Sequence, residues 1–115
     1  WVMFYEGCQR IAGGGLEVER QIGLATSRDG LEWTRVDGPD RDGSVLGQAP
    51  KGSGRWDYRL GCPWIVAMPD RSLRMYYIGS NERSAGGGSE LDTVNQIGLA
   101  VSDGNLLKWT RHVAS

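Results

Sequence analysis

Apolar and polar residues follow one another along this chain in short runs that predict β-strands. The runs are rich in aromatic and β-branched residues and end at glycine, and no segment sustains the period of an amphipathic helix. We expect strands at residues 60–67, 73–79, 96–102 and 107–112, and earlier copies of the last three at 1–7, 21–27 and 32–36. The pattern therefore predicts an all-β fold.

The chain contains an internal repeat. Residues 21–27 read Gln-Ile-Gly-Leu-Ala-Thr-Ser, and residues 96–102 read Gln-Ile-Gly-Leu-Ala-Val-Ser. The separation of matching positions grows from 72 residues between Met3 and Met75 to 76 between Trp33 and Trp109, so the insertions fall between the strands. A long repeat built of short β segments is typical of radial or solenoid β architectures.

The turns divide the repeat into antiparallel units. Short polar segments at 28–30, 68–72 and 103–105 supply the residues that tight hairpins need. Each unit is then a four-stranded meander, which must stack on a similar unit to cover its apolar faces. We expect about two blades of a β-propeller, with five blades in the full protein: an incomplete blade at 1–49 that lacks its first strand, and a second blade at 50–115.

Strand parity sorts the loops between the two ends of such a blade. The tight turns share one end, and the long connections 8–20, 37–59 and 80–95 share the other. Long loops gathered on one face of a rigid scaffold often form binding sites. The polar residues that these connections bring there are Arg10, Glu17, Glu19, Asp57, Arg59, Asn81, Glu82, Glu90 and Asp92. They line a polar funnel in one interpretation and are solvated loop charges in the other.

Charge and composition exclude several classes of partner. The net charge of −1 provides no strong field for nucleic acid or an anionic membrane, and no apolar run is long enough to span a bilayer. Because the chain begins at Trp1 inside an apolar strand, we expect a piece of a longer protein, and its compartment stays open. Cys8 and Cys62 lack metal-ligand spacing and are either buried thiols or a disulfide. Neither triple-glycine segment is a phosphate loop, so we expect no cofactor and no metal.

Residues 76–79, 97–104 and 109–111 resemble blades of the five-bladed β-propeller glycosidases. That superfamily includes arabinanases, β-xylosidases, invertases and levansucrases, in glycoside hydrolase families 43, 32, 62, 68 and relatives. The resemblance covers both repeats and implies a funnel-shaped carbohydrate site on the propeller axis. It also implies three carboxylates from successive blades, since glycoside hydrolysis uses one protonated and one ionised carboxyl group.

The catalytic residues of these families carry over only in part. Cys62-Pro63 matches the Glu-Cys-Pro motif of an inner strand, but Gly61 stands where the glutamate would be. The nearest acidic residue upstream is Asp57, which we expect to act as a base or a sugar-hydroxyl acceptor, with Arg59 beside it on the same side of an extended segment. The alternative is a structural Asp–Arg pair that fixes the loop.

Other side chains are expected to bind sugar or to pack. The candidate sugar-binding residues are Arg59, Trp56, Asn81, Glu82 and Glu6. Trp56 and Trp64 offer aromatic faces to a sugar ring, whereas Trp33 and Trp109 recur at equivalent positions and are expected to pack.

Three functions remain open. In the first, the chain is part of a carbohydrate-active propeller enzyme that hydrolyses or transfers a glycosyl unit. Its partners would be an oligo- or polysaccharide and the remaining blades of the same chain. The second is a sialidase-like propeller, because residues 27–33 resemble a degenerate aspartate box. The third is a noncatalytic sugar-binding or scaffold propeller, which the glycine at position 61 favours.

Overall fold

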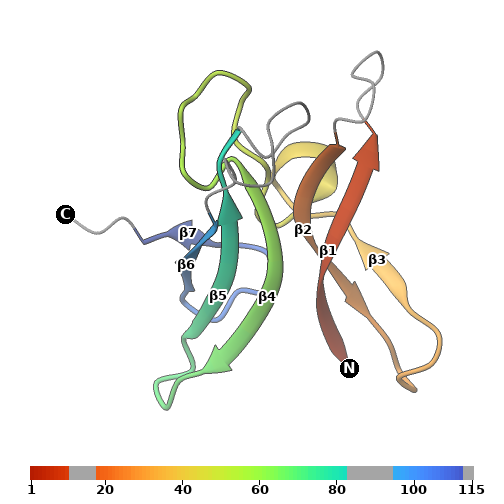
Figure 1. Cartoon of the computed structure of the whole chain (residues 1–115). Helices are drawn as coiled ribbons and strands as arrows, with labels where there is room; N and C mark the ends of the chain where they lie inside the picture. Colours follow the sequence, from red (N-terminus) through yellow and green to blue (C-terminus); the bar gives the residue numbers. More distant parts are fainter. Residues whose placement is uncertain (11–17, 83–94, 113–115) are drawn as a thin grey trace.

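A computed structural model describes residues 1–10, 18–82 and 95–112, which form two antiparallel sheets (Figure 1). The first sheet contains β1 (Val2–Arg10), β2 (Val18–Thr26) and β3 (Thr34–Val36), in that order. The second contains β4 (Arg59–Ala67), β5 (Leu73–Ser80), β6 (Asn95–Ser102) and β7 (Thr110–Arg111). A 3₁₀ turn, η1 (Arg41–Gly43), lies in the connection between the sheets. No helix of the described residues is long and apolar enough to cross a membrane.

The predicted all-β fold and the four-stranded antiparallel meander are confirmed. The repeat also holds in the strand register. Tyr5 lies opposite Gly23 in the first sheet, and Tyr77 lies opposite Gly98 in the second. The two sheets do not close into a ring, so the propeller stays a prediction.

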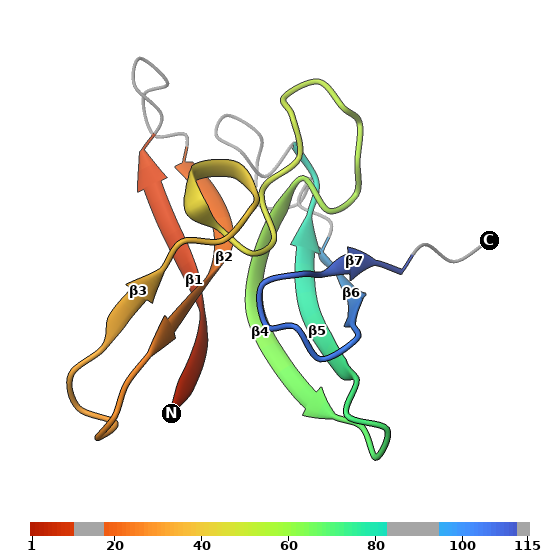
Figure 2. The same cartoon turned by 180° about the vertical axis from the view of Figure 1, so that it is seen from behind.

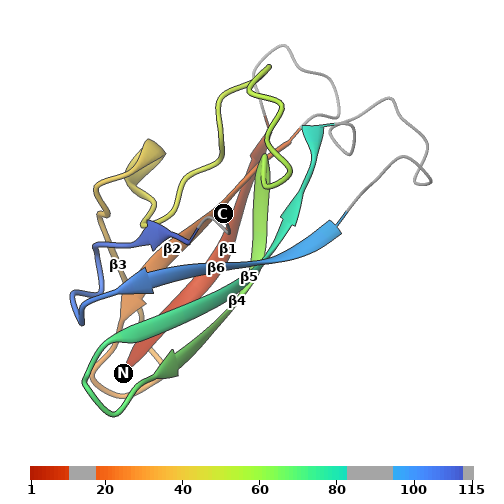
Figure 3. The ribbon, with the colours of Figure 1, turned by 90° about the vertical axis from the view of Figure 1, so that its left-hand side faces the viewer.

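The two sheets pack face to face, with β4 lying across β1 and β2 (Figures 2 and 3). Side chains alternate along each strand, so Phe4 of β1 points into this interface. Its ring meets Trp109 edge-on, with ring centroids 5.5 Å apart. The buried core consists of Ile22, Leu24, Val45, Leu46, Leu60, Met75, Tyr77 and Ala100.

The connection between the sheets is more buried than its polar sequence suggests. Residues 44–49 are all buried, and Leu46 forms a β-bridge with Ile22 of β2. The backbone N–H of Ile22 donates to the Leu46 carbonyl at 3.0 Å. Part of the expected long connection 37–59 therefore packs against the first sheet.

The described loops are distributed between the two ends as expected. Figure 1 shows the turns at 27–33 and 68–72 at the lower end and the loop 50–58 at the upper end. Glu17, Glu90, Asp92 and both triple-glycine segments lie outside the described residues. The expected strand at 107–112 is shortened to Thr110–Arg111, because residues 105–109 form a hydrogen-bonded turn.

Candidate functional site

Asp57 is the centre of a buried polar cluster at the loop end of the second sheet. Its carboxylate has no solvent exposure and accepts four hydrogen bonds. Arg55 donates two of them, from Nε at 2.8 Å and from Nη2 at 3.1 Å. The Tyr77 hydroxyl and Arg111 Nε each donate to Oδ2 at 3.0 Å, and Arg111 Nη2 also donates to the Gly47 carbonyl at 2.6 Å. The cluster thus joins the loop, β5, β7 and the connection from the first sheet.

A glycine on β5 allows the loop to lie this close to the sheet. A Cβ atom on Gly79 would stand 2.7 Å from Asp57 Cβ and 2.9 Å from its Cα. Any larger residue at position 79 would displace Asp57 and the adjoining Trp56. The aspartate is therefore positioned by the backbone of its neighbouring strand as well as by its ionic partners.

The electrostatics keep this carboxylate charged. Burial alone would raise the pKa of Asp57, but the hydrogen bonds from Arg55, the charge of Arg111 and the hydrogen bond from Tyr77 together lower it below its ordinary value. Burial, followed by the negative charge of Asp57, raises the pKa of Tyr77 to about 12. The Tyr77 hydroxyl consequently remains a neutral donor, and Asp57 remains an acceptor.

This geometry favours the structural alternative for Asp57 over a catalytic role. A fully buried carboxylate with both oxygens occupied does not face a substrate. Its arginine partners are Arg55 and Arg111, whereas Arg59, the partner suggested by spacing, lies buried at the start of β4. Sequence reasoning missed Arg55, Tyr77 and Arg111, although the recurrence of Tyr and Arg at matching repeat positions was an available signal.

Trp56 and Trp64 lie on different faces of the second sheet. The Trp56 indole stacks on Tyr77, with ring centroids 6.2 Å apart and planes 5° from parallel, and 38% of the residue stays exposed. Trp64 is 69% exposed and lies opposite Tyr76, on the face that points away from the first sheet. Only Trp56 lies beside the Asp57 cluster.

A rim pocket lies next to this cluster. We define it as a cavity of about 450 Å³ lined by Asp40, Arg41, Gly47, Gln48, Ala49, Pro50, Arg55 and Arg111. Two of its arginines, Arg55 and Arg111, are the ones that hold Asp57. The pocket therefore offers hydrogen-bond donors with fixed positions.

Glu82 and Asn81 follow β5 at the same end of the sheet. Both carboxylate oxygens of Glu82 accept from the Gly52 backbone N–H, at 3.1 and 3.0 Å. This bond ties the loop 50–54 to the end of β5. The structure thus brings Trp56, Asn81 and Glu82 to one end of the sheet.

Glu6 lies elsewhere, against the inner strand β4. A Cβ atom on Gly61 would overlap Glu6 Oε2, so the Glu6 carboxylate occupies the space that a side chain at position 61 would need. The same oxygen accepts from the Cys62 backbone N–H at 3.2 Å, and Oε1 lies 3.8 Å from Arg20 Nε. Cys62 adopts a positive φ of 49° inside a β-bulge. A carboxylate from the neighbouring sheet thus stands beside the Gly61-Cys62-Pro63 motif.

The stretch that resembles an aspartate box forms a closed turn. Asp29 Oδ1 accepts from the backbone N–H groups of Leu31 at 2.8 Å and Glu32 at 3.0 Å, and the same two bonds lower the pKa of Asp29. The Trp33 indole N–H donates to the Gly30 carbonyl at 3.2 Å. These contacts give the stretch a structural role in the turn between β2 and β3.

The cysteines are both free and exposed, so neither buried thiols nor a disulfide describes them. In the described part of the chain, no three His, Cys, Asp or Glu side chains gather as metal ligands would. No protein-family model, curated protein or solved structure matches the chain.

Proposed function

We propose that this chain is part of a carbohydrate-active β-propeller protein and that sugar binds at the loop end of the second sheet. The proposal is carried by one observation: a half-exposed indole, Trp56, is fixed on Tyr77 beside the polar rim pocket. The C–H face of a sugar ring suits an aromatic surface, and arginine N–H groups donate to sugar hydroxyls. The repeat and its resemblance to propeller glycosidases support the same conclusion.

Hydrolysis or glycosyl transfer needs two carboxyl groups on either side of the reacting bond. Asp57 is buried and ionised, which argues against it as either of them. Glu6 is the carboxylate nearest to the inner-strand motif, and its side chain is 31% exposed. For the described residues we therefore favour sugar binding, with the reaction, where the full protein has one, using carboxylates from other blades.

An oligosaccharide titration tests the proposal. Tryptophan fluorescence and calorimetry would follow arabino-, xylo- and fructo-oligosaccharides added to the parent chain and to Trp56→Ala and Trp64→Ala. We expect one sugar class to bind, and we expect Trp56→Ala to weaken that binding at least tenfold while Trp64→Ala leaves it unchanged. Circular dichroism would show that both variants fold. Equal binding by both variants, or no binding to the parent, would contradict the proposal.

The hydrogen-bonded turn at Asp29 also keeps the sialidase-like function as a second candidate. Titration with sialyllactose separates the two, because a sialidase-like site would bind this anionic sugar in preference to the neutral ones.

A further inference from the structure

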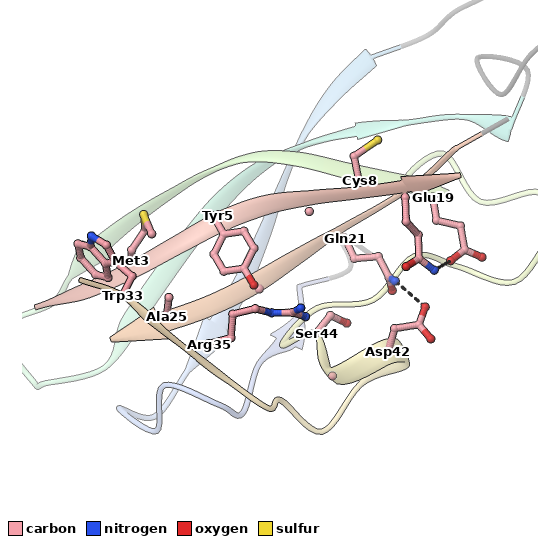
Figure 4. A pocket seen from close by; sticks show the side chains of 14 residues that line it. Met3, Tyr5, Cys8, Glu19, Gln21, Ala25, Trp33, Arg35, Asp42 and Ser44 are labelled. Carbon is pink, nitrogen blue, oxygen red and sulfur yellow. Dashed lines mark hydrogen bonds between the residues drawn. The ribbon is translucent and has the colours of Figure 1, made fainter. Parts of the chain in front are cut away.

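The face of the first sheet that points away from β4 carries an open cavity of about 390 Å³ (Figure 4). We call it the open face. The residues that line it include Met3, Tyr5, Gly23, Ala25, Trp33 and Arg35. Figure 4 shows Tyr5 and Arg35 on the same side of β1 and β2, with Cys8 pointing to the other side. Trp33 is 36% exposed here, although its recurrence predicted a packed position.

The open face is a repeat copy of the face that the second sheet buries. The matching residues, in the order given above, are Met75, Tyr77, Gly98, Ala100, Trp109 and Arg111. The local geometry matches as well, because a Cβ atom on Gly23 would overlap the Tyr5 ring just as one on Gly98 would overlap the Tyr77 ring. Yet Met75 is fully buried, whereas its counterpart Met3 is 37% exposed, and Trp33 and Arg35 are exposed as well. Ala25 is only 3% exposed and thus buried, as Ala100 is, because it lies at the centre of its sheet. The outer residues of this surface are thus covered in the second sheet and exposed in the first.

The covered copy shows what the open copy lacks. In the second sheet this face packs against the first sheet, where Phe4 meets Trp109. The segment that enters β4 adds Trp56 on Tyr77 and Asp57 on Tyr77 and Arg111, and β4 pairs with the edge of β5. In the first sheet, β1 pairs with β2 alone among the described strands. No described residue forms an ion pair with Arg35 or a hydrogen bond with the Tyr5 hydroxyl, so a cation and a phenol remain available to a carboxylate.

We propose that the open face and the free edge of β1 bind a strand from an additional repeat unit, with the chemistry of residues 55–67. Its aspartate accepts from Tyr5 and Arg35, its tryptophan stacks on Tyr5, and its apolar strand extends the sheet by edge pairing. The repeat fixes the register. Since Arg59 lies opposite Ser80 and Leu60 opposite Gly79, the matching residues of the bound strand lie opposite Cys8 and Gly7.

Disulfide trapping tests this register. The probe is a synthetic peptide with the sequence of residues 53–67, carrying Cys62→Ser and Arg59→Cys, and the target is the full chain with Cys62→Ser, which keeps Cys8. A control peptide carries Cys62→Ser and Leu60→Cys with Arg59 retained. Opposed residues have neighbouring side chains, whereas the next residue points to the other face. In a glutathione redox buffer we expect the first peptide to cross-link to Cys8 at least tenfold faster, and equal rates would overturn the proposal.

Fluorescence anisotropy with a labelled, cysteine-free form of the peptide tests the carboxylate. We expect Asp57→Asn in the peptide, or Arg35→Met in the full chain, to weaken binding about tenfold, whereas Arg28→Met on the exposed turn leaves it unchanged. Affinity that is insensitive to both changes would overturn the proposal. The proposal would also be overturned if sedimentation showed that the chain forms a dimer through this face and that Arg35→Glu dissociates the dimer. Neither experiment involves sugar, so failure of this proposal can be distinguished from failure of the proposed function.

Discussion

Replacing Asp57 by asparagine is the sharpest test of the buried cluster. The substitution preserves the size of the side chain and removes its charge. An asparagine has one acceptor oxygen, so it cannot accept at both positions. With its oxygen at the Oδ2 position its NH2 group faces Arg55 Nε, and in the other orientation the bonds from Tyr77 and Arg111 are lost. The variant therefore leaves donors facing a group that no longer accepts from all of them.

The magnitude follows from the exposure of each partner. The Arg55 side chain is 41% exposed, so water replaces its bonds at little cost. The Arg111 side chain is 21% exposed and Tyr77 is buried, and each donor left unpaired costs about 1–3 kcal/mol. We expect a loss of about 3 kcal/mol in the free energy of unfolding, within the range for breaking a buried ion pair. For a chain of this size that loss lowers the Tm by about 10–20 °C.

Urea and thermal unfolding of the parent and of Asp57→Asn, followed by circular dichroism, would measure this loss. Asp70→Asn is the matched control, because Asp70 is exposed in the 68–72 turn and its carboxylate accepts from Ser72 within the same turn. We expect the control to change stability by less than about 0.5 kcal/mol. A Tm of Asp57→Asn within the error of the parent would refute the assignment of Asp57 as the residue that holds these elements together.

Three further predictions concern the same region. Because the pKa of Asp57 is lowered by folding, its contribution to stability is complete above the unfolded-state pKa of about 3.9 and is lost as the pH falls through the folded-state pKa. The stability difference between the parent and Asp57→Asn should therefore shrink in acid. A difference that stays constant from about pH 7 to about pH 2 would contradict this. The pKa of Tyr77 is raised to about 12, so the absorbance titration of the parent should contain a phenol that ionises about two pH units above an ordinary tyrosine. Tyr77→Phe should remove this ionisation step. If the step remained in the variant, it would belong to another tyrosine. Gly79→Ala should destabilise the fold by about 1–3 kcal/mol, since the new methyl group meets the Asp57 backbone. Gly61→Ala should cost less, because its methyl group meets the movable carboxylate of Glu6. The reverse order in urea unfolding would be inconsistent with the structure.

The strands and the repeat could be predicted from sequence because both depend on local patterns. Alternation along residues 73–79 and 96–102 gives strands whose observed ends differ by one residue. The matching segments 21–27 and 96–102 also predict that the two sheets pair their strands in the same register. The pairing of Tyr5 with Gly23 and of Tyr77 with Gly98 confirms this.

The partners of Asp57 could not be predicted in the same way. Arg111 is 54 residues distant along the chain, and only the packing of β7 beside the loop brings it near. Spacing pointed to Arg59, because an alternation rule takes no account of where the chain enters the sheet. Trp33 and Trp109 show the same limit: their sequence contexts match, but only Trp109 has a sheet packed over it.

Nuclear Overhauser contacts to the Phe4 ring test the packing of the two sheets most directly. Phe4 and Trp109 come from different sheets, and their ring centroids are 5.5 Å apart. Trp33, the repeat partner of Trp109, lies on the opposite side of the first sheet, along the open face. We expect cross-peaks between the Phe4 ring and the Trp109 indole and none to Trp33. Cross-peaks to Trp33 in place of Trp109 would show that the first sheet presents its other face to the second and would contradict the account.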